Sequence, residues 1–236
     1  TGATVSGLFG KGTAMKRVVL EQFGLQGLTV TEAGGEPPEP GAGEVRVRWQ
    51  YASLNFHDLA AVLGMANPRM PLPQVPLSDG AGQIDAVGPG AEGWSVGDKV
   101  VSRFFPNWSS GAPSRASLSG VTGETLPGVA QQMAVVPASA VLPAPAHLNS
   151  EEAACLPCAA LTAWRAVVEE AGVKPGQRVL VQGTGGVSLF AVQFARMLGA
   201  EVYGISSTPE RCALLERLGA LPLTHFDIDE APCVSQ

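Results

Sequence analysis

The chain has few charged residues, and it has no apolar run long enough to cross a bilayer. Charged side chains make up 15% of its 236 residues, and the acidic ones predominate to give a formal net charge of −6. This balance provides no basic footprint for nucleic acid or for an anionic membrane surface. We therefore expect a small-molecule partner, and neither a nucleic acid nor a membrane.

Cysteine is absent from the first 154 residues, and the four cysteines present are Cys155, Cys158, Cys212 and Cys233. A disulfide framework would be denser and more evenly spread, so a reducing, cytoplasmic setting is expected. Cys155 and Cys158 have the spacing of a redox pair, but no thioredoxin-like strand precedes them, which makes the redox interpretation the weaker one. The apolar fraction of 45%, with 29 Gly and 19 Pro, indicates a well-buried globular protein with many turns.

The first half of the chain consists of short apolar runs separated by Gly and Pro turns. One helix is expected near Asn55 to Leu63, where Phe56, Leu59, Ala60 and Leu63 share a face, and Asn107 to Leu126 is predicted to be a long loop. The pattern favours a β-barrel-like domain. Its strand-like segments are 16–22, 28–33, 44–53, 80–88, 98–104 and 131–139.

The pattern changes near Asn149. Asn149 or Ser150, followed by two acidic residues, predicts the start of a helix over 151–170 with an interruption at Pro157. A buried strand over 178–182, a glycine loop, a second helix and a strand over 201–205 follow. This order predicts a parallel βαβ unit.

The glycine loop is the strongest functional signal. Gly183, Thr184, Gly185, Gly186, Val187 and Ser188 have the spacing of a dinucleotide-binding fingerprint, with Ser188 at the place of the third glycine. The helix N-terminus after the loop would offer unpaired N–H groups to a pyrophosphate. The alternative interpretation is a glycine-rich turn that binds nothing.

The end of the second strand of this unit indicates which nicotinamide cofactor is preferred. An NAD-binding fingerprint places a carboxylate there, whereas this chain has Ser206, Ser207 and Thr208, with Arg211 close behind. Hydroxyl groups and an arginine could bind a 2′-phosphate, so NADP(H) is favoured over NAD(H). The alternative is an ordinary helix cap at Ser207 or Thr208 with a solvated Arg211.

Several motifs occur in the order found in medium-chain dehydrogenase/reductases, which the chain resembles between Met15 and Ala220. They include PGAGEVRVRW, SLNFHDLAAVLG, PLPQVPLSDGAGQIDAVGPG, LPCAALTAWRAV and VKPGQRVLVQGTGGVSLFAVQFARMLGAEV. The resemblance implies an α/β fold with a β-rich part: a GroES-like β-barrel domain over 15–146, then an incomplete Rossmann domain over 147–220. Residues 1–14 would be an extension with Met15 as the natural start, and 221–236 a divergent tail.

The resemblance also bears on metal and on catalytic residues. Zinc-dependent members use Cys, His and Cys ligands, but Ser53 to Phe56 contains no cysteine and Ser78-Asp79 stands in place of a His-Glu pair. Hydroxyl and amide groups are poor zinc ligands, so we expect a zinc-independent, quinone-oxidoreductase-like member. The resemblance assigns Asn55 and Thr162 to the nicotinamide or substrate site. His57 and Asp58 are candidate ionisable groups, with a surface ion pair as the alternative.

Two functional hypotheses follow. The first is an NADP(H)-dependent oxidoreductase that transfers hydride to a carbonyl, enone or quinone substrate, with a homodimer as a candidate assembly. The second is a catalytically inactive fragment with at most nucleotide-binding or protein-interaction capacity. The second arises because the Rossmann pattern is expected to stop after two strands, as in a truncated or frameshifted version of a longer enzyme, leaving 179–181 as an open apolar edge.

Overall fold

A computed structural model describes residues 3–4, 15–33 and 38–223. It divides the chain into two compact units, Thr1–Cys158 and Ala159–Gln236. Each unit is described by itself. Among the described residues, no helix is long and apolar enough to cross a membrane.

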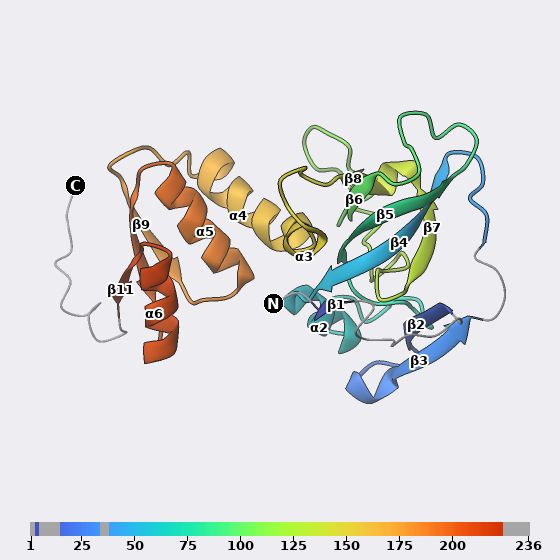
Figure 1. Ribbon diagram of the computed structural model, residues 1–236. Helices are drawn as coiled ribbons and strands as arrows, with labels where there is room; N and C mark the ends of the chain where they lie inside the picture. The colour runs from blue at the N-terminus through green and yellow to red at the C-terminus, as the bar shows by residue number, and fades with distance from the viewer. Residues whose placement is uncertain (1–2, 5–14, 34–37, 224–236) are drawn as a thin grey trace. The chain divides into compact units, whose positions relative to one another are not determined.

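The N-terminal unit is built on antiparallel strands. β4 (Glu44–Ser53) pairs with β5 (Asp79–Val87), and the two strands run side by side through the unit (Figure 1). The remaining strands of this sheet are β1 (Ala3–Thr4), β6 (Lys99–Ser102), β7 (Met133–Pro137) and β8 (Val141–Pro143). A separate hairpin joins β2 (Met15–Leu20) to β3 (Leu28–Ala33).

Period-2 alternation explains how these strands form a core. Val45, Val47 and Trp49 of β4 are buried and meet Ile84 of β5 and Val100 of β6 in one cluster, as expected for a sheet with one covered face. All six predicted strands are confirmed. The short strand β8 was not predicted, because its three residues contain two apolar side chains and a proline and show no alternation.

Two short helices complete the described part of this unit, with two 3₁₀ turns at Leu25–Gly27 and Ala138–Ala140. Helix α2 (Phe56–Val62) confirms the predicted helix, but its expected apolar face is the exposed one: Phe56 is 78% exposed, whereas Asp58, Ala61 and Val62 are buried. Helix α3 (Ser150–Ala153) begins at Asn149, whose side chain accepts a hydrogen bond from the Glu152 N–H at 2.9 Å. The predicted N-cap is confirmed.

The predicted helix over 151–170 consists of successive short pieces. A π-helical turn at Leu156–Ala160 precedes α4 (Leu161–Trp164), and a second π-helical turn follows at Arg165–Glu170. In the C-terminal unit, Trp164 packs edge-on against Phe194 with ring centroids 5.4 Å apart. The remaining elements are β9 (Arg178–Gln182), α5 (Gly186–Met197), β10 (Glu201–Ile205), α6 (Pro209–Arg217) and β11 (Leu221–Leu223).

The sheet of the C-terminal unit is parallel and has the order β11-β10-β9. The expectation of only two strands is wrong, because Leu221 to Leu223 pair in parallel with β10. Pro222 suits this edge position, since it has no N–H to leave unpaired. Helices α5 and α6 lie on one side of the sheet (Figure 1).

The other face of this sheet is open among the described residues. Leu180, Tyr203 and Leu221 are in register across the three strands. Leu180 is 58% exposed and Leu221 is 50% exposed on this face. Because β9 is also an edge strand of the sheet, the open apolar edge expected at 179–181 is present at Leu180. Val181 on the same strand is buried under the helices.

Candidate functional site

The glycine loop joins β9 to α5 and has space around it. Gly183 has φ +78°, a left-handed conformation that favours glycine, and its N–H donates to the Ile205 carbonyl at 2.9 Å. A Cβ atom at Gly183 or at Gly185 would meet no heavy atom within 4 Å. The loop therefore has both the turn and the open backbone surface that an approaching pyrophosphate needs.

The remaining residues of the motif make contacts within the protein, and some of them are also exposed. The Ser188 hydroxyl donates to the Gln182 carbonyl at 2.8 Å and ties the first turn of α5 to the end of β9. A Cβ at Gly186 would lie 3.3 Å from the Ala159 Cβ, in the π-helical turn Leu156–Ala160. The residue of the motif that must stay small for packing is therefore Gly186, and not Ser188 at the place of the third glycine. Val187 is 40% exposed, and Thr184 is half-buried beside it.

The residues after β10 were interpreted either as a 2′-phosphate site or as an ordinary helix cap, and the structure has features of both. Thr208 caps α6, since its side chain accepts a hydrogen bond from the Arg211 N–H at 3.4 Å. Ser207 and Arg211 are exposed, whereas Ser206 is buried and its N–H donates to the Leu223 carbonyl at 3.2 Å. The helix-cap alternative is thus correct for Thr208. Ser207 and Arg211 remain available to a ligand.

In the N-terminal unit, a buried polar cluster forms where α2 begins and β5 begins. Asp58 links the two elements: one carboxylate oxygen accepts from the Asn55 N–H at 2.7 Å and the other from the Ser78 N–H at 2.9 Å. Burial raises the pKa of Asp58, and these backbone hydrogen bonds oppose the shift. The carboxylate therefore fixes the helix N-terminus to the strand.

Asp79, the first residue of β5, lies at the centre of this cluster and is fully buried. Its Oδ2 accepts from the Cys158 N–H at 2.9 Å. Burial raises the pKa of Asp79 to about 7; the polar side chain of Asn55 opposes this shift, and the charge of Asp58 adds to it. Asp79 is thus still partly protonated near pH 7, where an ordinary aspartate has lost its proton.

Three polar atoms in the cluster are buried: Asn55 Nδ2, Ser78 Oγ and Asp79 Oδ1. The Asn55 and Ser78 side chains lie close enough to Asp79 to interact with its carboxyl group and lower its pKa, and Ser78 acts on Asp58 in the same way. Buried polar groups in folded proteins are nearly always paired, and here the three side chains are the partners of one another.

Leu77, which precedes Ser78 and Asp79, has an unusual backbone conformation. Its φ of +73° is in the left-handed region, which costs a leucine on the order of 1–2 kcal/mol. A Cβ at Gly123 would lie 2.6 Å from the Leu77 carbonyl carbon, and one at Gly128 would lie 2.3 Å from its oxygen. The Leu77 carbonyl also accepts from the Val129 N–H at 2.9 Å. The adjacent loop therefore sets the direction in which Ser78 and Asp79 leave Leu77.

The structure separates the two ionisable residues that are adjacent in sequence, His57 and Asp58. His57 Nε2 lies 3.3 Å from Glu124 Oε2 without hydrogen-bond alignment, and its ring packs edge-on against Phe104. Asp58 turns inward, so the surface ion pair considered for these two residues is wrong for Asp58. Thr162 is exposed on α4, in the C-terminal unit, whereas Asn55 belongs to the N-terminal unit.

The cysteines near this cluster do not form a redox pair. Cys155, Cys158 and Cys212 are free. Burial, with the nearby charges of Asp79 and Asp58, raises the pKa of Cys158 to about 12, which suppresses the reactive thiolate. Cys233 lies outside the described residues. Within the described part of the chain, no three His, Cys, Asp or Glu side chains gather in a way that could hold a metal ion.

Sequence reasoning missed the role of Asp79. It treated Ser78-Asp79 only as a replacement for metal ligands. The available signal was an aspartate at the start of a strand followed by Gly-Ala-Gly, which places a carboxyl group beside small residues in a buried segment. Its partners, Asn55 and Cys158, are far away in the sequence.

Comparisons with known proteins extend this picture. Residues 41–146 match the alcohol dehydrogenase GroES-like domain. The chain is 46% identical over 186 residues to a zinc-type alcohol dehydrogenase-like protein of Schizosaccharomyces pombe, covering 78% of this chain and 54% of that protein. It is 31% identical over 208 residues to an acryloyl-coenzyme A reductase of Metallosphaera sedula, covering 85% of this chain and 61% of that protein. It thus spans little more than half the length of these relatives.

Solved structures agree with the sequence relatives. A cobalt- and zinc-bound thermostable alcohol dehydrogenase from Pyrobaculum aerophilum has a TM-score of 0.80 and 35% sequence identity to this chain. The similarity covers 92% of this chain and 67% of that one.

Proposed function

The chain belongs to the alcohol dehydrogenase-like oxidoreductases of the medium-chain dehydrogenase/reductase superfamily. On this premise we propose that it functions as an NADP(H)-dependent, zinc-independent oxidoreductase. The substrate class is a carbonyl compound, a conjugated enone or a quinone, which accepts hydride from the reduced nicotinamide. The observation that carries the cofactor part is the glycine loop, with free space at Gly183 and Gly185 before the N-terminus of α5.

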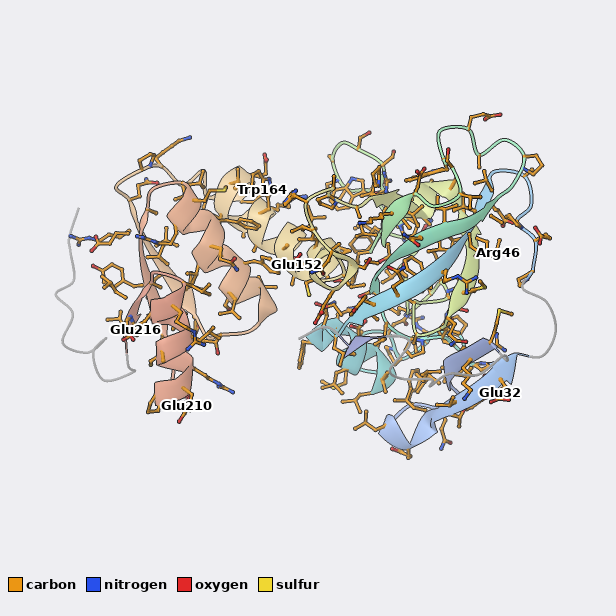
Figure 2. The ribbon with its side chains drawn as sticks, viewed as in Figure 1. Glu32, Arg46, Glu152, Trp164, Glu210 and Glu216 are labelled. Carbon is orange, nitrogen blue, oxygen red and sulfur yellow. The ribbon has the colours of Figure 1, made fainter. Side chains whose placement is uncertain are left out.

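The choice of NADP(H) is supported at the end of β10. Ser207 and Arg211 are exposed there, and the residues between Ile205 and Pro209 include no carboxylate to repel a 2′-phosphate. An arginine guanidinium forms strong charge-assisted hydrogen bonds to phosphate. Glu210 lies nearby in the first turn of α6 (Figure 2), a position that also places a negative charge beside the helix N-terminus.

Independence from zinc is supported by the chemistry of the polar cluster. The side chains that meet there are an amide, a hydroxyl, a carboxyl with its pKa raised to about 7 and the thiol of Cys158, without a histidine. Zinc prefers thiolate and imidazole ligands, and an amide and a hydroxyl are poor substitutes. These residues do not fit a catalytic zinc ion, so we assign no step to one.

The cofactor proposal is tested by titrating the purified chain with NADPH and with NADH. Arg211→Ala should weaken NADPH binding by roughly 1–3 kcal/mol, the scale of a hydrogen bond to a charged group, and should leave NADH binding unchanged. Arg217→Ala, in the last turn of the same helix, is the matched control and should change neither affinity. Equal losses for both cofactors in Arg211→Ala would show that this residue does not contact the 2′-phosphate.

The zinc proposal has its own measurement. Elemental analysis of protein purified without chelator should find no stoichiometric zinc, and a chelator should leave NADPH oxidation unchanged. One tightly bound zinc ion per chain would contradict the proposal.

A further inference from the structure

A groove of about 690 Å³ runs along β7 in the N-terminal unit, and none of the candidate site residues described above lines it. Within the described residues, β7 pairs with β4 alone, so one side of this strand carries no further strand (Figure 1). The other walls of the groove come from β2 and from the loop segments 73–75 and 126–129. Its volume is in the range of small-molecule binding sites.

The lining of the groove is largely apolar. Trp49, Val75 and Val129 are at most 8% exposed and form its buried part, and Met133 and Val135 of β7 line it as half-buried residues. Removing apolar surface of a ligand from water against such a wall is favourable, by an amount that grows with the length of the apolar chain.

The polar side chains in the lining already have partners within the protein. Gln74 donates to the Glu124 carbonyl at 2.8 Å, Thr122 to the Arg103 carbonyl at 2.7 Å, and Gln131 to the Gly128 carbonyl at 2.7 Å. Groups that are satisfied in this way do not require hydrogen bonds from a ligand. The body of a fitting ligand is therefore apolar.

The charge around the groove is opposite in sign to that of the chain. Acidic residues outnumber basic ones by 21 to 15 in the sequence, yet the described residues that line the groove include Lys16 and Arg17 and no aspartate or glutamate. Lys16 pairs with Glu32 at 3.5 Å (Figure 2). An anionic group on the ligand is therefore complementary to this surface.

Arg17 is the cation that remains available to such a group. Its Nε donates to the Thr31 hydroxyl at 3.4 Å, a neutral partner, and among the described residues no carboxylate forms an ion pair with it. Met15, Arg17 and Val19 alternate along β2 and so share one face of the strand. The guanidinium therefore lies between two apolar side chains that line the groove.

We propose that this groove binds a medium-chain aliphatic carboxylate, with the alkyl chain against Trp49 and Val129 and the carboxylate on Arg17. A guanidinium forms charge-assisted, bidentate hydrogen bonds to a carboxylate, and the apolar wall accepts the chain. The site is separate from the proposed cofactor site, which belongs to the C-terminal unit, and the inference does not depend on the proposed oxidoreductase function.

Calorimetric titration of the whole chain at pH 8 tests the ligand class with decanoate, decan-1-ol and decyltrimethylammonium, each below its micelle concentration. Decanoate should bind with one site per chain and about tenfold more tightly than decan-1-ol, the scale of hydrogen bonds to a charged group. Octanoate, shorter by two methylenes, should bind roughly tenfold more weakly than decanoate. No binding of decanoate, or equal affinities for the three decyl compounds, would overturn the inference.

Arg17→Gln tests the carboxylate contact, because it removes the charge and keeps a side chain of similar length. Decanoate affinity should fall about tenfold and become similar to that of decan-1-ol, whose own affinity should stay the same. Arg115→Gln is the matched control: Arg115 is exposed on another loop and does not line the groove. An unchanged decanoate affinity in Arg17→Gln would show that this residue does not bind the head group.

Val135→Trp tests the location, because an indole at this position fills the groove. It should abolish binding of decanoate and of decan-1-ol, whereas Val30→Trp should leave both unchanged, since Val30 is 61% exposed on β3 and does not line the groove. Decanoate binding that survives in Val135→Trp would place the ligand elsewhere and overturn the inference. If this variant does not fold, Met133→Glu takes its place, with the same expected loss of decanoate because it puts a negative charge in the wall.

Discussion

The polar cluster of the N-terminal unit and the glycine loop of the C-terminal unit are opposite kinds of site. In the cluster, Asp58 and Asp79 are closed off from solvent and accept hydrogen bonds from the backbone of three other residues. In the loop, Gly183 and Gly185 have free space where a side chain would be. The cluster has its chemistry built into the fold, whereas the loop provides only an open shape and the N-terminus of a helix.

This difference determines how each site should respond to mutation. A change in the closed cluster alters the free energy of unfolding as well as any chemistry, because buried charges and hydrogen bonds are coupled to folding. A change in the open loop can alter ligand binding while leaving the fold intact. Three predictions test this contrast, in order of decreasing effect.

The largest effect concerns the pH dependence of stability and Asp79. Its pKa is about 7 in the folded protein and near 3.8 in the unfolded chain. Between these values the unfolded state binds fewer protons, so the free energy of unfolding falls as pH rises, by a total on the order of 4 kcal/mol at pH 7 and above. Asp79→Asn should remove this loss, as measured by urea unfolding at pH 4 and at pH 8.

Asp85, at the other end of β5, is the control for this prediction. Partial burial raises its pKa, but hydrogen bonds from Arg48 and from Arg46 on β4 (Figure 2) outweigh burial and lower it. Asp85 therefore stabilises the fold above its unfolded pKa and loses that effect as the pH falls, the opposite sign to Asp79. If Asp79→Asn shows the same pH slope as the wild-type chain, the buried carboxyl does not hold its proton.

The second effect concerns Gly185 and should appear in binding alone. Its φ of −74° and ψ of 170° suit any residue, and an added Cβ meets nothing within 4 Å. Gly185→Val should therefore change the free energy of unfolding by no more than about 0.5 kcal/mol. It should weaken NADPH binding about 100-fold, or about 2.7 kcal/mol, by blocking the pyrophosphate. Fluorescence titration and urea unfolding give the two values.

Gly204 on β10 is the matched control, because its surroundings are closed. A Cβ there would lie 2.7 Å from a Leu215 methyl group, so Gly204→Val should destabilise the fold. Should Gly185→Val prove the more destabilising of the two, the loop is not the open surface described above.

The smallest effect concerns Thr208, which stands between the two kinds of site as a helix cap beside a predicted phosphate contact. Thr208→Ala removes the acceptor of the Arg211 N–H and should cost about 1 kcal/mol of stability, the usual value of an N-cap. The ratio of NADPH to NADH affinity should stay constant. A selective loss of NADPH binding in this variant would assign the phosphate contact to Thr208 as well as to Arg211.

Local patterns were enough to predict most of the fold. Alternation in β4 and the cap at Asn149 are properties of neighbouring residues, and both were read correctly from the sequence. The third parallel strand at 221–223 was missed because three residues carry no periodic signal. The outward face of α2 was misjudged because helical spacing shows which residues share a face but not which face is covered.

The two sites differ in the same way. The glycine loop is contiguous, so its spacing alone predicted the position now seen between β9 and α5. The polar cluster joins Asn55, Asp79 and Cys158, which only the packing of α2, β5 and the segment after α3 brings together. No single-sequence pattern records that meeting or the burial that raises the pKa of Asp79.

The left-handed Leu77 has a consequence for protein engineering. Gly123 and Gly128 lie so close to its backbone that neither can carry a side chain without moving it, and Val129 holds its carbonyl. The segment containing these glycines is an irregular loop, the kind of element usually chosen for exchange between homologues. Transplanting a loop of equal length without both glycines would therefore move the Leu77 backbone and, with it, reorient Asp79.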